Sequence, residues 1–192
     1  MRRLLSGVIL GIAVSVSAAN GVRSGPQIGE RPLPFTSNMV TGPQRGQQYC
    51  YVCQLKDEPA LLVFTRAADG ASGKLLRELR DAVRRYRDQR LFAWMVLLGP
   101  GGSSSETALE RQAYMLAEEN SSTEIPVAAL GDPEGPPGYR INPAAAVTVI
   151  VFRSGKVLYN RAYTGKEWGG RAADDALRLL PSLLEPKPPA KN

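Results

Sequence analysis

The chain has 192 residues, of which 43% are hydrophobic, and this length and composition are typical of one globular domain. Its 24 basic and 18 acidic residues give a mild positive charge without a basic patch interleaved with aromatic residues, so nucleic acid is not an expected partner. The absence of His excludes imidazole as a general base or a metal ligand. With only two cysteines, any disulfide within one chain must join Cys50 to Cys53.

The N-terminus shows the order of features that is typical of a secretory signal. Arg2 and Arg3 precede an apolar run over residues 4–16, and small residues follow at 17–19. The run is shorter than the ~20 residues of a membrane-spanning helix, although an uncleaved anchor is the alternative. We therefore expect residues 1–19 to be a signal peptide of a protein that is exported to a periplasm or out of the cell. After cleavage we expect no membrane contact.

The regions that flank the packed domain are rich in Gly and Pro. We expect a flexible leader over residues 20–30, a short edge strand at 33–35 and a turn at 41–43. The domain itself is expected over residues 31–185. A Pro- and Lys-rich tail at 186–192 is expected to be disordered.

The domain alternates apolar strands with amphipathic helices. Residues 60–65 and 91–98 are nearly all apolar, which is typical of strands buried on both faces. Apolar residues recur at helical spacing over 74–89, and Ser103 with Glu106 forms a capping box for a helix to about residue 120. Further elements are expected as a strand at 125–130, a hairpin of 146–152 with 156–163, and a helix at 171–184 that Pro181 kinks or shortens.

This order of elements predicts an α/β domain. A strand–helix–strand unit gives parallel strands through a right-handed crossover, and the late hairpin adds antiparallel strands to the same sheet. We expect a three-layer fold in which helices cover both faces of a mixed central sheet.

Three segments carry a family resemblance. Residues 125–133 (Ile-Pro-Val-Ala-Ala-Leu-Gly-Asp-Pro) resemble the strand and Asp loop of peroxiredoxins, and residues 139–142 resemble the step that follows it. Residues 147–157 resemble the late hairpin of thioredoxins. Over about residues 30–185 the chain thus resembles the thioredoxin-like superfamily, in its redoxin and peroxiredoxin-like branch. The resemblance implies a thioredoxin-like fold.

The chain departs from this family at two positions that matter for activity. Thioredoxins carry the redox Cys-x-x-Cys after the first central strand, where a helix N-terminus activates the thiol. Residues 65–70 read Thr-Arg-Ala-Ala-Asp-Gly, without Cys, so peroxidase activity by the family mechanism is not expected. Val147 stands where thioredoxins have a cis-Pro, and a cis bond there would cost about 3 kcal/mol.

The candidate catalytic residues are therefore Cys50 and Cys53, in a Cys-x-x-Cys pair displaced to the upstream side of the strand 60–65. In an extended strand, residues three apart lie ~10 Å from each other and point to opposite faces. A disulfide needs Cα atoms within about 7 Å. The pair is therefore either a turn or a helix start, or it is not bonded.

Three functions remain open for this pair. In thiol–disulfide exchange with a protein thiol or disulfide substrate, Cys50 would attack and Cys53 would resolve the mixed disulfide. Arg45, Lys56 and Arg66 are candidates for stabilising the thiolate.

As a second possibility, the chain is a non-catalytic binding or scaffold module. The pair then forms a structural disulfide, which stabilises the fold by only about 2 kcal/mol through the loop entropy of the unfolded chain. As a third possibility, the two thiolates bind a metal such as Zn(II) or Cu(I). No cofactor is expected, and the sequence leaves the oligomeric state open. Tyr51, Trp94 and Trp168 are expected to serve in packing.

Overall fold

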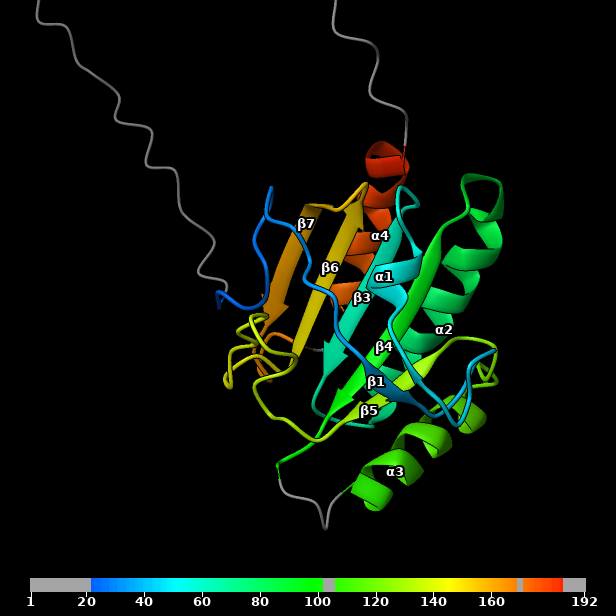
Figure 1. The fold of residues 1–192 in the computed structure, drawn as a ribbon, viewed down its shortest axis with the longest axis vertical. Coiled ribbons are helices and arrows are strands. Elements are labelled where there is room, and N and C mark those ends of the chain that lie inside the picture. Colours follow the sequence, from blue (N-terminus) through cyan, green and yellow to red (C-terminus); the bar gives the residue numbers. More distant parts are fainter. Residues whose placement is uncertain (1–21, 102–105, 169–170, 185–192) are drawn as a thin grey trace, which may run out of the picture.

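The computed structural model describes residues 22–101, 106–168 and 171–184. Seven strands form one mixed sheet in the order β2-β1-β5-β4-β3-β6-β7 (Figure 1). The strands are β1 Ser37–Met39, β2 Gln48–Tyr49, β3 Ala60–Thr65, β4 Phe92–Leu98, β5 Val127–Leu130, β6 Val147–Arg153 and β7 Lys156–Tyr163. The α-helices are α1 Tyr51–Gln54, α2 Gly70–Arg85, α3 Glu106–Glu119 and α4 Arg171–Leu184, and a 3₁₀ turn spans Arg87–Gln89.

Strand β3 is the centre of the sheet. It pairs in parallel with β4 on one side and antiparallel with β6 on the other, so that Ala60 lies between Phe92 and Phe152. All six of its residues are buried, as the apolar run predicts. β4 continues in parallel to β5, and β6 turns back into β7. The predicted mixed α/β sheet is therefore confirmed.

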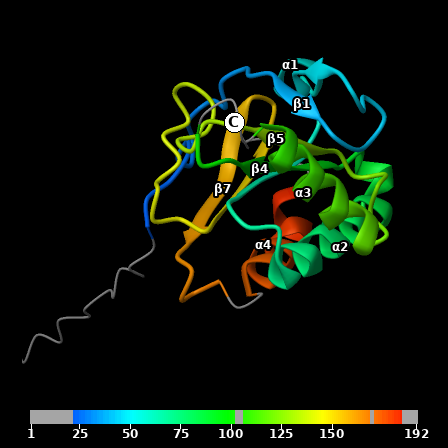
Figure 2. The same cartoon turned by 90° about the horizontal axis from the view of Figure 1, so that it is seen from below.

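Helices cover the two faces of the sheet unequally. α2, α3 and α4 share one face, which we call the helical face, and α1 lies on the other, the α1 face (Figure 2). Alternation along β3 divides its side chains, since Leu61 and Val63 join the core of the helical face and Leu62 and Phe64 that of the α1 face. The connections from β3 to β4 and from β4 to β5 both run in the same direction along the sheet. Because such crossovers are right-handed, their helices α2 and α3 lie on the same face.

The irregular segment at residues 24–26 covers part of the α1 face, and its burial corrects a prediction. Residues 24–26 are buried and do not form the expected flexible leader. The Ser24 Oγ lies 2.8 Å from the Thr148 Oγ1. The Asn160 Nδ2 donates to the carbonyls of Ser24 (2.8 Å) and Pro26 (2.7 Å). Because buried carbonyls need donors, these side chains fix the segment against β6 and β7.

The structure also tests three smaller expectations, for residues 33–35, for the turn at 41–43 and for Pro181. Residues 33–35 cross the α1 face without forming the expected strand. The Leu33 carbonyl accepts the Tyr139 hydroxyl (2.9 Å), and β1 begins only at Ser37. The turn at 41–43 is present, and Gly42 adopts φ +82° beside Pro126. Pro181 lies inside α4, which still reaches Leu184. The expected signal peptide, the tail and Ser103 lie outside the described residues.

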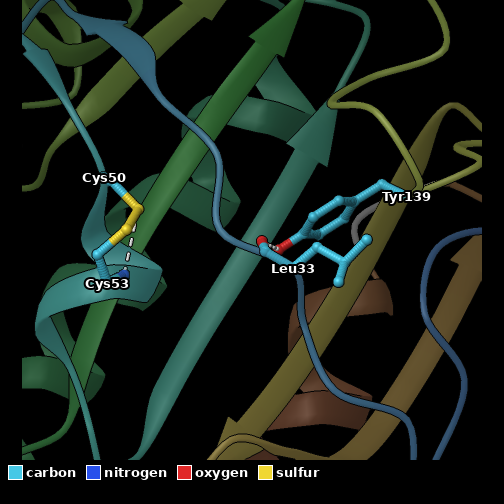
Figure 3. The surroundings of a disulfide bond; sticks show 4 residues. All are labelled: Leu33, Cys50, Cys53 and Tyr139. Atoms are coloured by element: carbon cyan, nitrogen blue, oxygen red, sulfur yellow. Dashed lines mark hydrogen bonds between the residues drawn. A yellow bond between two sulfur atoms is a disulfide. The ribbon is translucent and has the colours of Figure 1, made fainter.

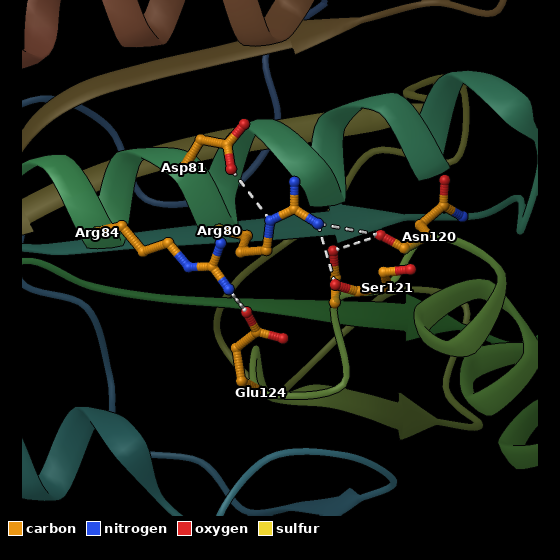
Figure 4. Close-up of polar contacts among 7 residues, drawn as sticks. Arg80, Asp81, Arg84, Asn120, Ser121 and Glu124 are labelled. Atoms are coloured by element: carbon orange, nitrogen blue, oxygen red, sulfur yellow. Dashed lines mark hydrogen bonds and ion pairs between the residues drawn. The ribbon is translucent and has the colours of Figure 1, made fainter.

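Polar contacts join α2 to the turn between α3 and β5 (Figure 4). The Arg80 Nη1 donates to the carbonyls of Ser121 (2.9 Å) and Asn120 (3.3 Å). The Arg84 guanidinium pairs with Glu124 at 2.6 Å. Exposed pairs of this kind contribute about 0–1 kcal/mol each, so they orient the turn more than they stabilise the fold. Within the described residues, no helix is long and apolar enough to cross a membrane.

The anchoring of the N-terminal segment predicts that Asn160→Ala lowers the free energy of unfolding by about 1–2 kcal/mol, because the Pro26 carbonyl loses its donor and the Ser24 carbonyl keeps only the 3.4 Å contact from the Gln27 Nε2. Hydrogen exchange of residues 24–29 should rise with it. The control is Ile28→Ala in the same segment, since Ile28 is 68% exposed and should change stability by less than about 0.5 kcal/mol. Urea denaturation and amide exchange measure both, and equal effects of the two variants would contradict the assignment.

Candidate redox site at Cys50 and Cys53

Cys50 and Cys53 are joined by a disulfide at the start of α1 (Figure 3). Cys50 follows β2 with an extended backbone (φ −115°, ψ 95°), and the helix begins at the next residue. The helical turn brings the two Cα atoms to 5.4 Å, within the range of a disulfide. Of the geometries that the sequence allows, the structure therefore shows the helix start.

The Cys50 sulfur has a specific hydrogen-bond donor. As the N-cap of α1, its Sγ accepts the backbone N–H of Cys53 at 3.2 Å. Such a bond stabilises a thiolate when the disulfide opens, and a thiolate is the reactive form of Cys. Cys50 is partly buried and Cys53 is exposed, so the pair is open to a reacting group. Because the helix has only four residues, this single N–H stabilises a Cys50 thiolate more than the helix dipole does.

Tyr51 fixes α1 to the sheet. Its side chain is 5% exposed, and its ring centroid lies 4.5 Å from that of Phe92 and 5.6 Å from that of Trp94. Its hydroxyl donates to the Gln44 Oε1. Burial raises the pKa of Tyr51 above its ordinary value, with a smaller contribution from Tyr49, so the hydroxyl stays protonated near neutral pH. Tyr51 is thus a packing residue, as expected.

Two of the three expected thiolate stabilisers are engaged elsewhere. The Arg45 guanidinium lies 4.9 Å from the centre of the Tyr114 ring on α3. Arg66 donates to the carbonyls of Ala145 (3.0 Å) and Asn142 (3.2 Å), and burial lowers its pKa. Lys56 is exposed just after α1, with φ 38°. The expectation for Arg45 and Arg66 is therefore wrong, because folding engages each of them with partners other than the Cys50 sulfur.

The position that thioredoxins use for their redox pair holds other residues here. Asp69 caps α2 by accepting the Ser72 N–H at 2.8 Å, and the Ser72 Oγ lies 3.1 Å from the Thr65 Oγ1. Val147 pairs with Thr65, and the described residues contain no cis peptide bond. This position follows the carboxyl end of β3. α1 packs instead on the amino-terminal end of the parallel strand β4, so the two positions lie at opposite ends of the sheet.

Other expected roles can also be placed. Trp94 and Trp168 are 1% and 6% exposed, which confirms that both are core residues. Metal binding would need both thiolates, and the disulfide consumes them. No group of three or more Cys, Asp or Glu residues that could hold a metal occurs in the described part of the chain. Gln44 carries no local sequence signal as a neighbour of the site, because its contact with Tyr51 depends on the turn before β2.

The N–H that Cys50 receives predicts an order of reactivity in the reduced protein. Cys50 should react with iodoacetamide several-fold faster than Cys53, although Cys53 is the more exposed residue, because the N–H stabilises the Cys50 thiolate. Peptide mass spectrometry after timed alkylation measures both rates in one sample. Cys50→Ser and Cys53→Ser supply the single-thiol controls, and faster labelling of Cys53 would reverse the assignment.

Comparisons with known proteins bear on the fold. No protein-family model and no curated protein matches the chain. Among solved structures, the chain is similar to a candidate protein disulfide isomerase from Bacteroides thetaiotaomicron, with a TM-score of 0.59, 17% identity, and coverage of 85% of this chain and 94% of that one. A candidate thiol:disulfide interchange protein DsbE from Chlorobium tepidum gives a TM-score of 0.59 and 16% identity, with 83% and 99% covered.

Peroxidoxin BcpB from Mycobacterium tuberculosis gives a TM-score of 0.55 and 19% identity, with 82% and 97% covered. Sequence identities this low support a shared fold and nothing more. The strand order, the crossovers and these likenesses agree, and the chain has the thioredoxin-like fold.

Proposed function

We propose that this protein is an exported thiol–disulfide exchange protein that acts through Cys50 and Cys53. The observation that carries the proposal is the bonded Cys-x-x-Cys at an accessible helix start, with the Cys53 N–H on the Cys50 sulfur. A disulfide across so short a loop stabilises the fold by only about 2 kcal/mol, so structure alone is a weak reason for it. Two of the structurally similar proteins are named as a protein disulfide isomerase and a thiol:disulfide interchange protein, and these names support thiol–disulfide exchange as the proposed chemistry.

The exchange proceeds in two steps. In the reduced protein, the Cys50 thiolate attacks one sulfur of a substrate disulfide, forms a mixed disulfide and releases the other substrate sulfur as a thiolate. The Cys53 thiolate then attacks the Cys50 sulfur and releases the second substrate thiolate. The Cys50–Cys53 bond forms as the mixed disulfide breaks, so that over both steps one substrate disulfide is reduced and two electrons pass from the protein to the substrate. A substrate dithiol reverses both steps, and the relative reduction potentials set the direction.

The proposal of export rests on the sequence of the N-terminus. The charged, apolar and small-residue order of residues 1–19 is that of a secretory signal. Export would place the pair in a periplasmic or extracellular environment, where disulfides persist and where exchange of protein disulfides is needed.

A non-catalytic binding or scaffold module is the second candidate, and a specific observation favours it. The usual redox position of the fold is occupied by the Asp69 cap and the buried Ser72, and Arg66 is bonded to the carbonyls of Ala145 and Asn142 beside it. A chain that lost catalysis at this position could keep Cys50–Cys53 as a structural link.

An insulin reduction assay separates the two candidates. We expect the wild type to accelerate the reduction of insulin by dithiothreitol, and Cys50→Ser to lose at least about tenfold because it lacks the attacking thiolate. The matched control is Asp69→Asn, which keeps an acceptor for the Ser72 N–H and should retain the wild-type rate. Equal rates for the wild type and Cys50→Ser would leave the scaffold function as the better account.

Export has its own test. When the full chain is expressed in a secreting bacterial host, the recovered protein should begin at Asn20, directly after the small residues 17–19. N-terminal sequencing of the extracytoplasmic fraction identifies that residue. Replacing Arg2 and Arg3 by Glu should retain the protein in the cytoplasm as a precursor. Recovery of uncleaved wild-type chain in the membrane fraction would indicate an anchor.

A further inference from the structure

Strand β2 leaves one side of the sheet open next to the redox pair. β2 is the end strand of the sheet, paired with β1 alone, and no described residue pairs with its outer side. Gln47 and Gln48 are exposed, and Tyr49 and Cys50 are partly buried. The chain passes directly from this edge into Cys50, so the edge and the reacting sulfur are consecutive in the sequence.

The hydrogen-bond pattern shows which backbone groups face the open side. The Met39 N–H donates to the Gln47 carbonyl (2.9 Å), so this position belongs to the bonded pairs of the β1–β2 ladder. In an antiparallel ladder bonded and non-bonded pairs alternate, and Asn38 with Gln48 is the next pair. Asn38 instead faces β5, opposite Ala129. The N–H and C=O of Gln48 therefore point to the free edge.

An added strand at this edge would have the spacing that a mixed disulfide needs. Residues opposite each other on antiparallel strands have Cα atoms about 4.5–5.5 Å apart. The Cα atoms of a disulfide are about 4.4–6.8 Å apart. Cys50 keeps the extended backbone of β2 (φ −115°, ψ 95°), so the strand geometry reaches as far as the sulfur-bearing residue. A cysteine opposite Cys50 would thus lie at bonding distance without a change in the backbone.

We propose that the substrate is an extended, cysteine-containing segment of another polypeptide, which pairs antiparallel with β2 and presents its cysteine to Cys50. The proposal rests on the exchange function proposed above and names its substrate class. The Gln48 N–H and C=O bind the segment through its backbone, which makes the pairing independent of the substrate sequence.

A groove beside the edge adds a site for one substrate side chain. It has a volume of about 580 Å³ and lies between the β1–β2 hairpin and α3. Gln48, Arg45, Glu110, Arg111 and Tyr114 are among the residues that line it. Opposite residues on paired strands send their side chains to the same face, so the residue opposite Gln48, two positions from the substrate cysteine, points toward this groove. Its lining combines apolar surface with the charged side chains of Arg45, Glu110 and Arg111, which suits a long side chain with a polar end.

The test compares exchange with a polypeptide and exchange with a small disulfide. Gln48→Pro removes the outward N–H, while Pro is compatible with an edge strand. The ratio of the insulin rate to the rate with bis(2-hydroxyethyl) disulfide should fall about five- to tenfold, because the small reagent needs no strand pairing. Gln48→Ala removes the same side chain but keeps the N–H, so its ratio should stay well above that of Gln48→Pro. An unchanged ratio in Gln48→Pro would overturn the proposal, whereas failure of the wild type with both reagents would overturn the exchange function itself.

A second measurement does not depend on the folding of a proline variant. Cys53→Ser cannot resolve the mixed disulfide, so it traps a cysteine peptide on Cys50. In this adduct the Gln48 amide should exchange with deuterium at least about tenfold more slowly than in the peptide-free Cys53→Ser protein. A disulfide adduct with 2-mercaptoethanol, which has no backbone, should show no such protection. Equal exchange of the Gln48 amide in the peptide adduct and in the free protein would exclude pairing at this edge.

Discussion

The pairing of β3 on both sides is the constraint on which the rest of the molecule depends. Its six buried residues pair with β4 in parallel and with β6 antiparallel, so the strand is held by neighbours on both sides inside the sheet. Because β3 is fixed, its carboxyl end sets the start of α2, and its amino end sets the path that the chain takes from α1. The usual redox position of the fold follows the carboxyl end of this strand, and the Cys50–Cys53 disulfide lies on the approach to its amino end.

The position of α1 is a consequence of burial on the α1 face. A helix of one turn is not stable by itself, since nucleation costs more than so few hydrogen bonds return. Tyr51 and Leu55 compensate for this cost, with exposed fractions of 5% and 6% in a core that also contains Trp94. The disulfide and the N–H on the Cys50 sulfur are therefore held by core packing, while the two cysteines stay accessible.

Much of the fold could be predicted because its signals are local. The apolar runs at 60–65 and 91–98, the helical spacing after residue 70 and the late hairpin all show a period that belongs to one element. The region before residue 60 has no such period. Its folding depends on distant partners such as Thr148, Asn160 and Tyr139, so the buried segment at 24–26 and the strands β1 and β2 were not predicted.

For the candidate site, the sequence by itself determined the chemistry that is available. It excludes imidazole, allows a single intrachain disulfide and shows that residues 65–70 lack Cys. Only the tertiary structure decided that Cys50 and Cys53 form a helix start, that Arg45 and Arg66 act elsewhere and that the edge of β2 is open beside the sulfur. The reason is physical. Residue types fix which reactions are possible, whereas distances between residues far apart in the chain arise from sheet pairing and core packing.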